Sequence, residues 1–291
     1  MRALALAGGG VRGVVTLRVL IELEAALGAR LANRCDLLAG TSTGALVACG
    51  LGIGMSPGEV LAAYRSLAAS VFGGLSGPGL FAPAHPHQPL ERALRYLFGA
   101  RPLAELRPRV LIPVYDWRAR RLRVAKSWEP SWAPVPIVDV LRGTTAAPGY
   151  LRPHHHQGAQ WIDGGVAAND PTLCALAEGV ALGWAAHEIR MVAVSTGAAL
   201  PAAMPSAASW GIVGWAPHLV GVVLGGAADA VGYQAAALLG DRYVRLDPAL
   251  SREVPLDAAR SIPELEADAA RWLSGGDGVG AIKAAAGVLG A

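Results

Sequence analysis

Two glycine-rich turns near the N-terminus constrain the fold of this chain more than any other feature of its sequence. An apolar run at residues 4–7 ends in the turn at residues 8–13, and leucines then recur three or four positions apart. A second apolar run, residues 35–39, ends in the turn at residues 40–44 and is again followed by a helical pattern. Two consecutive units of strand, glycine turn and helix predict a parallel sheet that is covered by helices.

Later segments extend this α/β pattern. Helical spacing predicts helices at residues 57–71 and 90–98 and the start of a short helix at residues 136–141. Apolar runs predict further strands at residues 110–115, 121–125 and 191–195, and an edge strand at residues 242–246.

The chain is expected to form a single domain over residues 1–291. Its length and its hydrophobic content of 53% suffice for one sizeable core, and no repeat or long polar linker divides it. Residues 56–106 combine helical stretches with a loop rich in Gly, Pro and His, which predicts a cap or lid. Residues 251–291 are expected to form a helical tail.

The composition argues against several classes of protein. A net charge of +3, with scattered basic residues, gives no indication of a nucleic-acid partner. Three cysteines without metal-ligand spacing argue against a disulfide framework and favour a reducing, cytoplasmic location. The N-terminal apolar run is too short for a signal peptide. Residues 212–231 are apolar but interrupted by Pro217 and Asp229, so a core or interfacial helix is expected rather than a membrane-spanning one.

Ser42 is the candidate nucleophile. The run Gly40-Thr41-Ser42-Thr43-Gly44 matches the G-x-S-x-G nucleophile elbow, in which small neighbours allow a strained turn to lift the serine above the sheet. The following helix directs its N-terminus, and its partial positive charge, at the same point. The alternative is that Thr41, Ser42 or Thr43 only caps that helix.

The first glycine turn has two interpretations. Gly8, Gly10 and Gly13 match the dinucleotide fingerprint G-x-G-x-x-G, which requires an acidic residue about 20 positions further on, at the end of a second strand. Arginines occupy that zone, and Asp36 opens the next strand instead of ending it. Three consecutive glycines, with Gly9 at their centre, better suit an oxyanion hole, because their N–H groups can turn toward one point.

Read alone, Asp163 and the histidines have structural interpretations. Asp163 precedes Gly164 and Gly165, and Asp-Gly is a common turn pair. Three adjacent histidines, residues 154–156, cannot all face one point and are expected to lie in a solvated loop without a metal or catalytic role. No histidine is placed as a triad base.

In order along the chain, these motifs resemble the patatin-like phospholipase family, whose members share G-G-G-x-R-G, a G-x-S-x-G elbow and a D-G-G or D-G-A turn. The similarity extends to the stretch from Thr144 to Tyr150, whose Ala146-Ala147-Pro148 resembles the family's A-A-P turn, and to the stretch from Asp163 to Pro171, which resembles D-G-G-x-x-x-N-x-P. The resemblance spans roughly residues 1–246 and implies a three-layer α/β/α sandwich with a mainly parallel central sheet.

The resemblance also implies roles for individual residues. Ser42 would be the nucleophile and Asp163 its partner in a Ser-Asp dyad. The oxyanion hole would comprise Gly9, Gly10 and the N–H of Thr43, with the surrounding loop of Gly8, Arg12 and Gly13 adding support and positive potential. The elbow and turn glycines Gly40, Gly44, Gly164 and Gly165 would support these groups.

The implied activity is hydrolysis of phospholipid or lysolipid esters through an acyl-enzyme, without a metal or other cofactor. Because an aspartate is a weak base, the site would have to be covered so that burial raises its pKa. Residues 73–80 could open the site during transient contact with a membrane surface. The alternatives are a membrane-degrading effector activated by a messenger or partner and, more distantly, a dinucleotide-binding oxidoreductase.

Overall fold

A mixed, mostly parallel sheet of eight strands lies at the centre of the computed structural model, which describes residues 1–74, 82–199 and 211–290. Five strands run parallel, in the spatial order β3, β2, β1, β7, β9. They are β3 (Arg109–Asp116), β2 (Leu37–Gly40), β1 (Arg2–Leu6), β7 (Arg190–Val194) and β9 (Tyr243–Leu246). The antiparallel strands are β4 (Arg121–Lys126), β6 (Ala159–Asp163) and β5 (His154–His156), and β8 (Ala198–Ala199) pairs with β10 (Ala249–Leu250) beside the sheet.

Alternating residues of the central strands face two separate hydrophobic clusters. In β1, Leu4 and Leu6 belong to the larger cluster, whereas Ala3 and Ala5 belong to the smaller one. This period of two is the consequence of strand geometry. Strands buried on both faces read as continuous apolar runs, which is why the sequence identified them.

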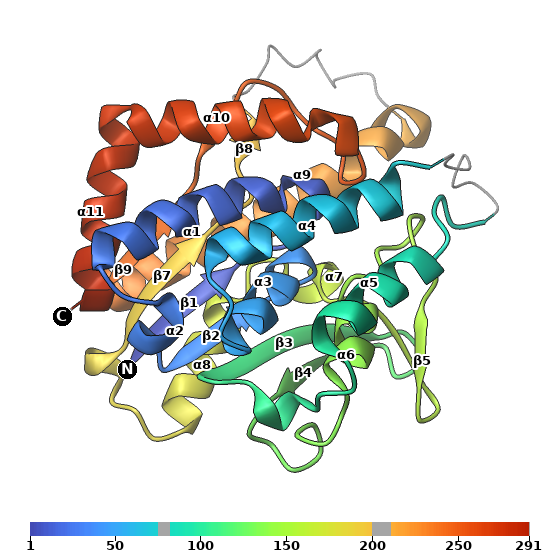
Figure 1. Cartoon of the computed structure of the whole chain (residues 1–291), viewed down its shortest axis with the longest axis horizontal. Coiled ribbons are helices and arrows are strands. Elements are labelled where there is room, and N and C mark those ends of the chain that lie inside the picture. The colour runs from blue at the N-terminus through green and yellow to red at the C-terminus, as the bar shows by residue number, and fades with distance from the viewer. Residues whose placement is uncertain (75–81, 200–210, 291) are drawn as a thin grey trace.

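Helices cover both faces of the sheet, so the fold is a three-layer α/β/α sandwich with unequal outer layers. In Figure 1, α1 and α4 lie in front of the sheet and α10 runs along the top. This larger layer contains α1 (Gly13–Leu27), α3 (Thr43–Gly52), α4 (Pro57–Phe72), α5 (Gln88–Phe98), α6 (Ile137–Thr144), α10 (Ile262–Ser274) and α11 (Gly276–Gly290). The opposite face carries α8 (Thr172–Ala181) and the end of α9 (Ile212–Leu239), while α2 (Leu31–Arg34) and α7 (Gly165–Ala168) are single turns.

The segments expected to be a cap and a tail both contribute to the main core. Tyr64 and Leu67 of α4 are buried in the larger cluster, as are Leu265 of α10 and Leu289 of α11. Residues 56–106 therefore contain core helices as well as loop. Of the predicted lipid-facing loop, residues 73–80, all but Gly73 and Gly74 lie outside the described residues.

Two sequence interpretations need correction. The histidine run is the strand β5, paired with β6, and not a solvated loop. For the apolar helix α9 the sequence left a core or an interfacial helix open, and the core alternative is wrong, because most of its described side chains from residue 221 onward are exposed. The interfacial alternative stays a prediction. The segment Gly221–Arg242, which includes the end of α9 and the turn after it, is long and apolar enough to span a membrane by length and composition, and 11% of an 18-residue apolar window within it is buried.

One topological feature brings distant segments together. Leu111 of β3 pairs with Lys126 of β4 and with Ala39 of β2, while Tyr115 pairs with Leu122 of β4 and Ile162 of β6. A strand has only two edges, so β2 and β6 must share the edge of β3 that β4 leaves free. They approach from opposite directions, and their carboxyl ends meet.

Candidate active site

Ser42 occupies the sharp turn between β2 and α3. Its φ of 53° and ψ of −119° are unusual for a residue other than glycine, and such a backbone typically costs about 1–3 kcal/mol. The turn is tight on both sides. A Cβ on Gly44 would lie 2.1 Å from the carbonyl oxygen of Leu6, and one on Gly40 would lie 2.3 Å from that of Gly44. The elbow thus requires its two glycines for steric reasons.

Asp163 ends β6 and is buried next to Ser42. One carboxylate oxygen, Oδ1, accepts a hydrogen bond of 2.7 Å from the N–H of Gly165. Burial raises the pKa of Asp163 to about 6, although hydrogen bonds from Gly165 and from the side chain of Ser42 act in the opposite direction. Gly164 lies so close to β3 in space that a Cβ there would be 2.1 Å from the carbonyl oxygen of Pro113.

Three backbone N–H groups are available around Ser42. Within the described part of the chain, the N–H groups of Gly9, Gly10 and Thr43 have no hydrogen-bond acceptor. By contrast, the N–H of Gly8 donates to the carbonyl of Asn169 at 3.1 Å, and the N–H of Gly13 donates to carbonyls within its own loop. The N–H groups of Gly9, Gly10 and Thr43 are the three to which the resemblance assigns the oxyanion hole, an assignment that stays a prediction.

The loop around Gly10 is held from several directions. Its carbonyl oxygen accepts hydrogen bonds from Tyr64 Oη at 2.5 Å and from Thr43 Oγ1 at 3.0 Å. The next N–H, that of Val11, donates to the carbonyl of Leu256 at 2.7 Å. Because Gly10 has a φ of 56° and a Cβ there would lie 2.1 Å from the same carbonyl, only glycine fits.

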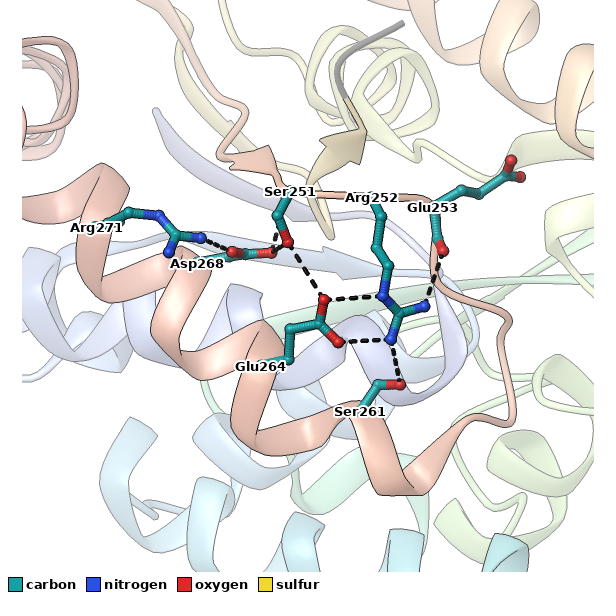
Figure 2. A network of polar contacts seen from close by, with 7 residues as sticks. All are labelled: Ser251, Arg252, Glu253, Ser261, Glu264, Asp268 and Arg271. Carbon is teal, nitrogen blue, oxygen red and sulfur yellow. Dashed lines mark hydrogen bonds and ion pairs between the residues drawn. The ribbon is translucent and has the colours of Figure 1, made fainter. Parts of the chain in front are cut away.

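Leu256 belongs to a C-terminal segment that a polar network fastens to α10. Figure 2 shows Arg252 reaching across to Glu264 and Ser261, while Ser251 points to Asp268. The N–H and hydroxyl of Ser251 both donate to Asp268 at 2.9 Å, and Arg271 pairs with the same carboxylate. The network therefore anchors the segment that braces the glycine loop.

Arg12 lies beside the glycine loop and adds positive charge to it. Its Nε is 3.4 Å from the carbonyl oxygen of Gly9. Burial lowers the pKa of this guanidinium, and the charge of Glu253 partly offsets that effect. Arg12 thus braces the carbonyl of Gly9.

Thr144 and Asn169 complete the site, and the sequence alone assigns a role to neither. Thr144 accepts the N–H of Ser42 at 3.0 Å and donates to the carbonyl of Pro113 at 2.7 Å, which fills the gap between β2 and β6. Asn169 Nδ2 lies 3.3 Å from the carbonyl oxygen of Gly8. Both residues fall in segments that resemble family motifs, and that resemblance could have indicated them. Nothing in the sequence indicated Tyr64, because it lies on the apolar side of a helix.

The alternative interpretations of the site lose their support. Asp36 accepts a hydrogen bond from the N–H of Arg2 at 2.8 Å, at the end of the sheet opposite to the glycine loop, so it is not placed to bind a ribose. In the described residues, no histidine forms a hydrogen bond with Ser42 or Asp163. His85 instead contacts Asp257 at 2.9 Å, and His154 contacts Asp139.

The arrangement has the parts needed for acyl transfer. A serine stands on a strained turn, a buried carboxylate with a raised pKa contacts it, and three free N–H groups lie nearby. A hydroxyl, a base and a set of oxyanion donors are together what attack on a carbonyl carbon requires.

Comparison with known proteins points to the same chemistry. The patatin-like phospholipase family matches residues 4–176, a segment that contains both Ser42 and Asp163. The chain is 31% identical over 258 residues to a cGAMP-activated phospholipase of Pseudomonas aeruginosa (strain BWHPSA011 / Pa011), covering 84% of this chain and 77% of that relative. It is 28% identical over 300 residues to patatin-like protein 4 of Arabidopsis thaliana, covering 84% and 75% respectively. Among solved structures, VipD from Legionella pneumophila aligns with a TM-score of 0.45 and 13% identity, over 93% of this chain and 66% of that one.

Proposed function

Because this chain belongs to the patatin-like phospholipase family and is therefore a lipid acyl hydrolase, we propose that it cleaves phospholipid or lysolipid esters through a Ser42–Asp163 dyad and a covalent acyl-enzyme. The observation that carries the proposal is the buried carboxylate of Asp163. Its pKa of about 6 makes it a stronger base than an exposed aspartate, yet leaves it largely ionised at neutral pH.

The reaction proceeds in two steps. Ser42 Oγ attacks the ester carbonyl while its proton passes to Asp163, and the oxyanion accepts hydrogen bonds from the N–H groups of Gly9, Gly10 and Thr43. The carbon–oxygen bond to the alcohol then breaks, and the alcohol leaves with the proton from Asp163. Water subsequently attacks the acyl-enzyme and gives a proton to Asp163, which returns it to Ser42 as the fatty acid is released.

Covalent labelling tests the dyad. The wild-type protein is exposed to a fluorophosphonate lipid analogue and weighed by intact-protein mass spectrometry, alongside Ser42→Ala, Asp163→Asn and the matched control Ser66→Ala, an exposed serine on α4. We expect one adduct on the wild type and the control and none on Ser42→Ala. Asp163→Asn should react about 10²–10⁴-fold more slowly, the usual contribution of a general base. An adduct that persists at full rate in Asp163→Asn would exclude the aspartate as the base.

The outer face of α9 supports transient contact with a membrane surface. Val222 and Val223 are exposed, and α9 packs against α7, the short helix directly after Asp163, where Val166 is also exposed. Exposed apolar side chains that adjoin a lipid-hydrolysing site fit insertion into the headgroup region. The three free thiols of Cys35, Cys49 and Cys174 support a cytoplasmic location, from which such contact would be peripheral.

A second candidate function is hydrolysis that requires a small messenger. It is supported by the name of a relative with 31% identity, a cGAMP-activated phospholipase. The test is lipid hydrolysis by the purified protein with and without cGAMP. Stimulation would establish messenger control, whereas equal rates would leave an unregulated hydrolase.

A further inference from the structure

The histidine strand and helix α6 form a cluster of metal-ligating side chains outside the active site. His154 and His156 are alternate residues of β5 and point to one face, whereas His155 points to the other and is exposed. On that face His154 Nε2 lies 3.1 Å from Asp139 Oδ1, and His156 Nδ1 lies 3.6 Å from Asp139 Oδ2. One ligand atom from each of the three residues lies within 4.8 Å of the others.

Aromatic packing fixes the position of both imidazoles. His156 stacks on Trp161 of the neighbouring strand with ring centroids 4.9 Å apart, and His154 contacts the same ring at 6.1 Å. Trp161 is buried and packs in turn against Trp132. Packing on Trp161 therefore restricts both imidazoles before a ligand binds, which reduces the conformational entropy that is lost on binding.

Among the residues that the structure describes, the imidazole of His156 forms no hydrogen bond. Its Nδ1 is too far from Asp139 for one, and its Nε2 is buried without a partner. Imidazoles packed in a partly buried site normally satisfy at least one nitrogen. An ion that accepts the lone pair of Nδ1 would give that nitrogen a partner and leave the proton on Nε2.

We propose that Asp139, His154 and His156 bind one divalent transition-metal ion of the Zn²⁺ type. Two imidazole nitrogens and a carboxylate are ligands that such ions prefer, while Mg²⁺ and Ca²⁺ prefer oxygen alone. Ligand atoms around tetrahedral Zn²⁺, at bond lengths of about 2.0–2.1 Å, lie about 3.3 Å apart. The contacts of 3.1 and 3.6 Å end on different oxygens of Asp139, but one ligand atom from each residue lies within 4.8 Å of the others, so small side-chain rotations would bring one oxygen and two nitrogens to that spacing. The positive charge of Arg95 acts on Asp139 at a distance, but its guanidinium is paired with the carboxylate of Glu91, 2.8 Å away. A fourth position is left for water.

The ion would connect two elements that carry groups of the active site. Asp139 lies on α6, which ends at Thr144, the acceptor of the Ser42 N–H. The histidines lie on β5, which pairs with β6, the strand that ends at Asp163. The ion would therefore act as a clamp between α6 and the hairpin of β5 and β6.

The test uses Zn²⁺ alone and the full chain without an affinity tag, after removal of metal with a chelator. We expect isothermal titration to show one bound Zn²⁺ per chain and thermal unfolding to shift to higher temperature as Zn²⁺ is added. Asp139→Ala and His156→Ala should weaken binding by at least about tenfold, whereas His155→Ala should bind Zn²⁺ as the wild type does. His155 is the matched control because it is adjacent and exposed.

Two results would overturn the assignment. One is the lack of stoichiometric binding to the wild type, which would make the cluster an ion-pair network. The other is an equal loss in His155→Ala and His156→Ala, which would indicate adventitious binding by the histidine run. If circular dichroism shows that the ligand variants fail to fold, the visible absorption spectrum of the wild type with bound Co²⁺ tests the proposal instead. Visible absorption bands of a tetrahedral site support the clamp, and their absence contradicts it. Neither measurement depends on ester hydrolysis, so the result is independent of the proposed dyad.

Discussion

At the scale of single residues, burial of Asp163 gives the carboxylate its basicity and also destabilises the native state. A rise of its pKa from 3.8 to about 6 corresponds to about 3 kcal/mol. The folded protein holds this proton more tightly than the unfolded chain does. The native state is therefore unaffected well below pH 3.8, loses stability as the pH rises toward about 6, and carries the full cost above it.

This cost can be measured with Asp163→Asn. The asparagine has no charge to bury. The difference in unfolding free energy between the variant and the wild type should therefore shift in favour of the variant by about 2–3 kcal/mol as the pH rises from 4 to 8. Denaturant unfolding at both values measures the difference. Ser42→Ala is the control, because it should also be inactive but retains the ionisable aspartate, so its stability should fall with rising pH as that of the wild type does. A stability difference between Asp163→Asn and wild type that is the same at both pH values would contradict the raised pKa.

At the scale of elements, the network in Figure 2 contains both exposed and buried contacts between the C-terminal segment and α10, and these differ in strength. Arg252 and Glu264 are both more than one third exposed, with side-chain exposures of 50% and 38%, and exposed ion pairs contribute about 0–1 kcal/mol. Asp268 is 1% exposed and accepts both polar hydrogens of Ser251. Removal of this carboxylate would leave the N–H of Ser251 without an acceptor.

We therefore expect Asp268→Ala and Arg252→Ala to differ in their effect on stability. Asp268→Ala should lower the free energy of unfolding by about 1–3 kcal/mol, because the N–H of Ser251 loses its acceptor. Arg252→Ala should lower it by less than about 1 kcal/mol. Chemical denaturation of both variants measures the two values. Equal losses would mean that the exposed arginine, and not the buried carboxylate, anchors the segment.

Element types were predictable where the sequence carried a strong local period. The expected helix at residues 57–71 is α4 (Pro57–Phe72), which Ser56 caps with Glu59 in a capping box, and the expected edge strand at residues 242–246 is β9. The histidine run was misjudged, because polar residues after Arg152-Pro153 resemble a loop. Pairing with β6 and packing on Trp161 make it a strand, and neither contact is visible in the local sequence.

At the scale of the whole molecule, α9 presents an apolar face on the outside of the fold. Its inner side includes Ala235 and Leu239, which are buried, whereas Val222 and Val223 are more than half exposed. Composition alone could not distinguish this helix from a core helix, because both are apolar along their length. Only the packing of α9 on the thinner side of the sheet leaves one face uncovered.

Binding to vesicles tests the role of this face. The double variant Val222→Glu, Val223→Glu should bind phospholipid vesicles at least about tenfold more weakly, because charged side chains resist transfer into the membrane interface. Hydrolysis of a soluble short-chain ester should be unchanged. The control is Val279→Glu, at an exposed valine on α11. Unchanged vesicle binding by the double variant would exclude this face as the membrane contact.

The local requirements of this fold can be read from the amino-acid sequence. Strand, glycine turn and helix follow from hydrophobic periodicity, and the glycines at positions 10 and 44 are needed because carbonyl oxygens approach where a Cβ would lie. The tertiary structure decided how Ser42 meets Asp163, which is 121 positions later (163 − 42). They meet because β2 and β6 share one edge of β3, and Thr144 closes the gap between them. Strand order is a property of the assembled sheet, so no local pattern specifies it.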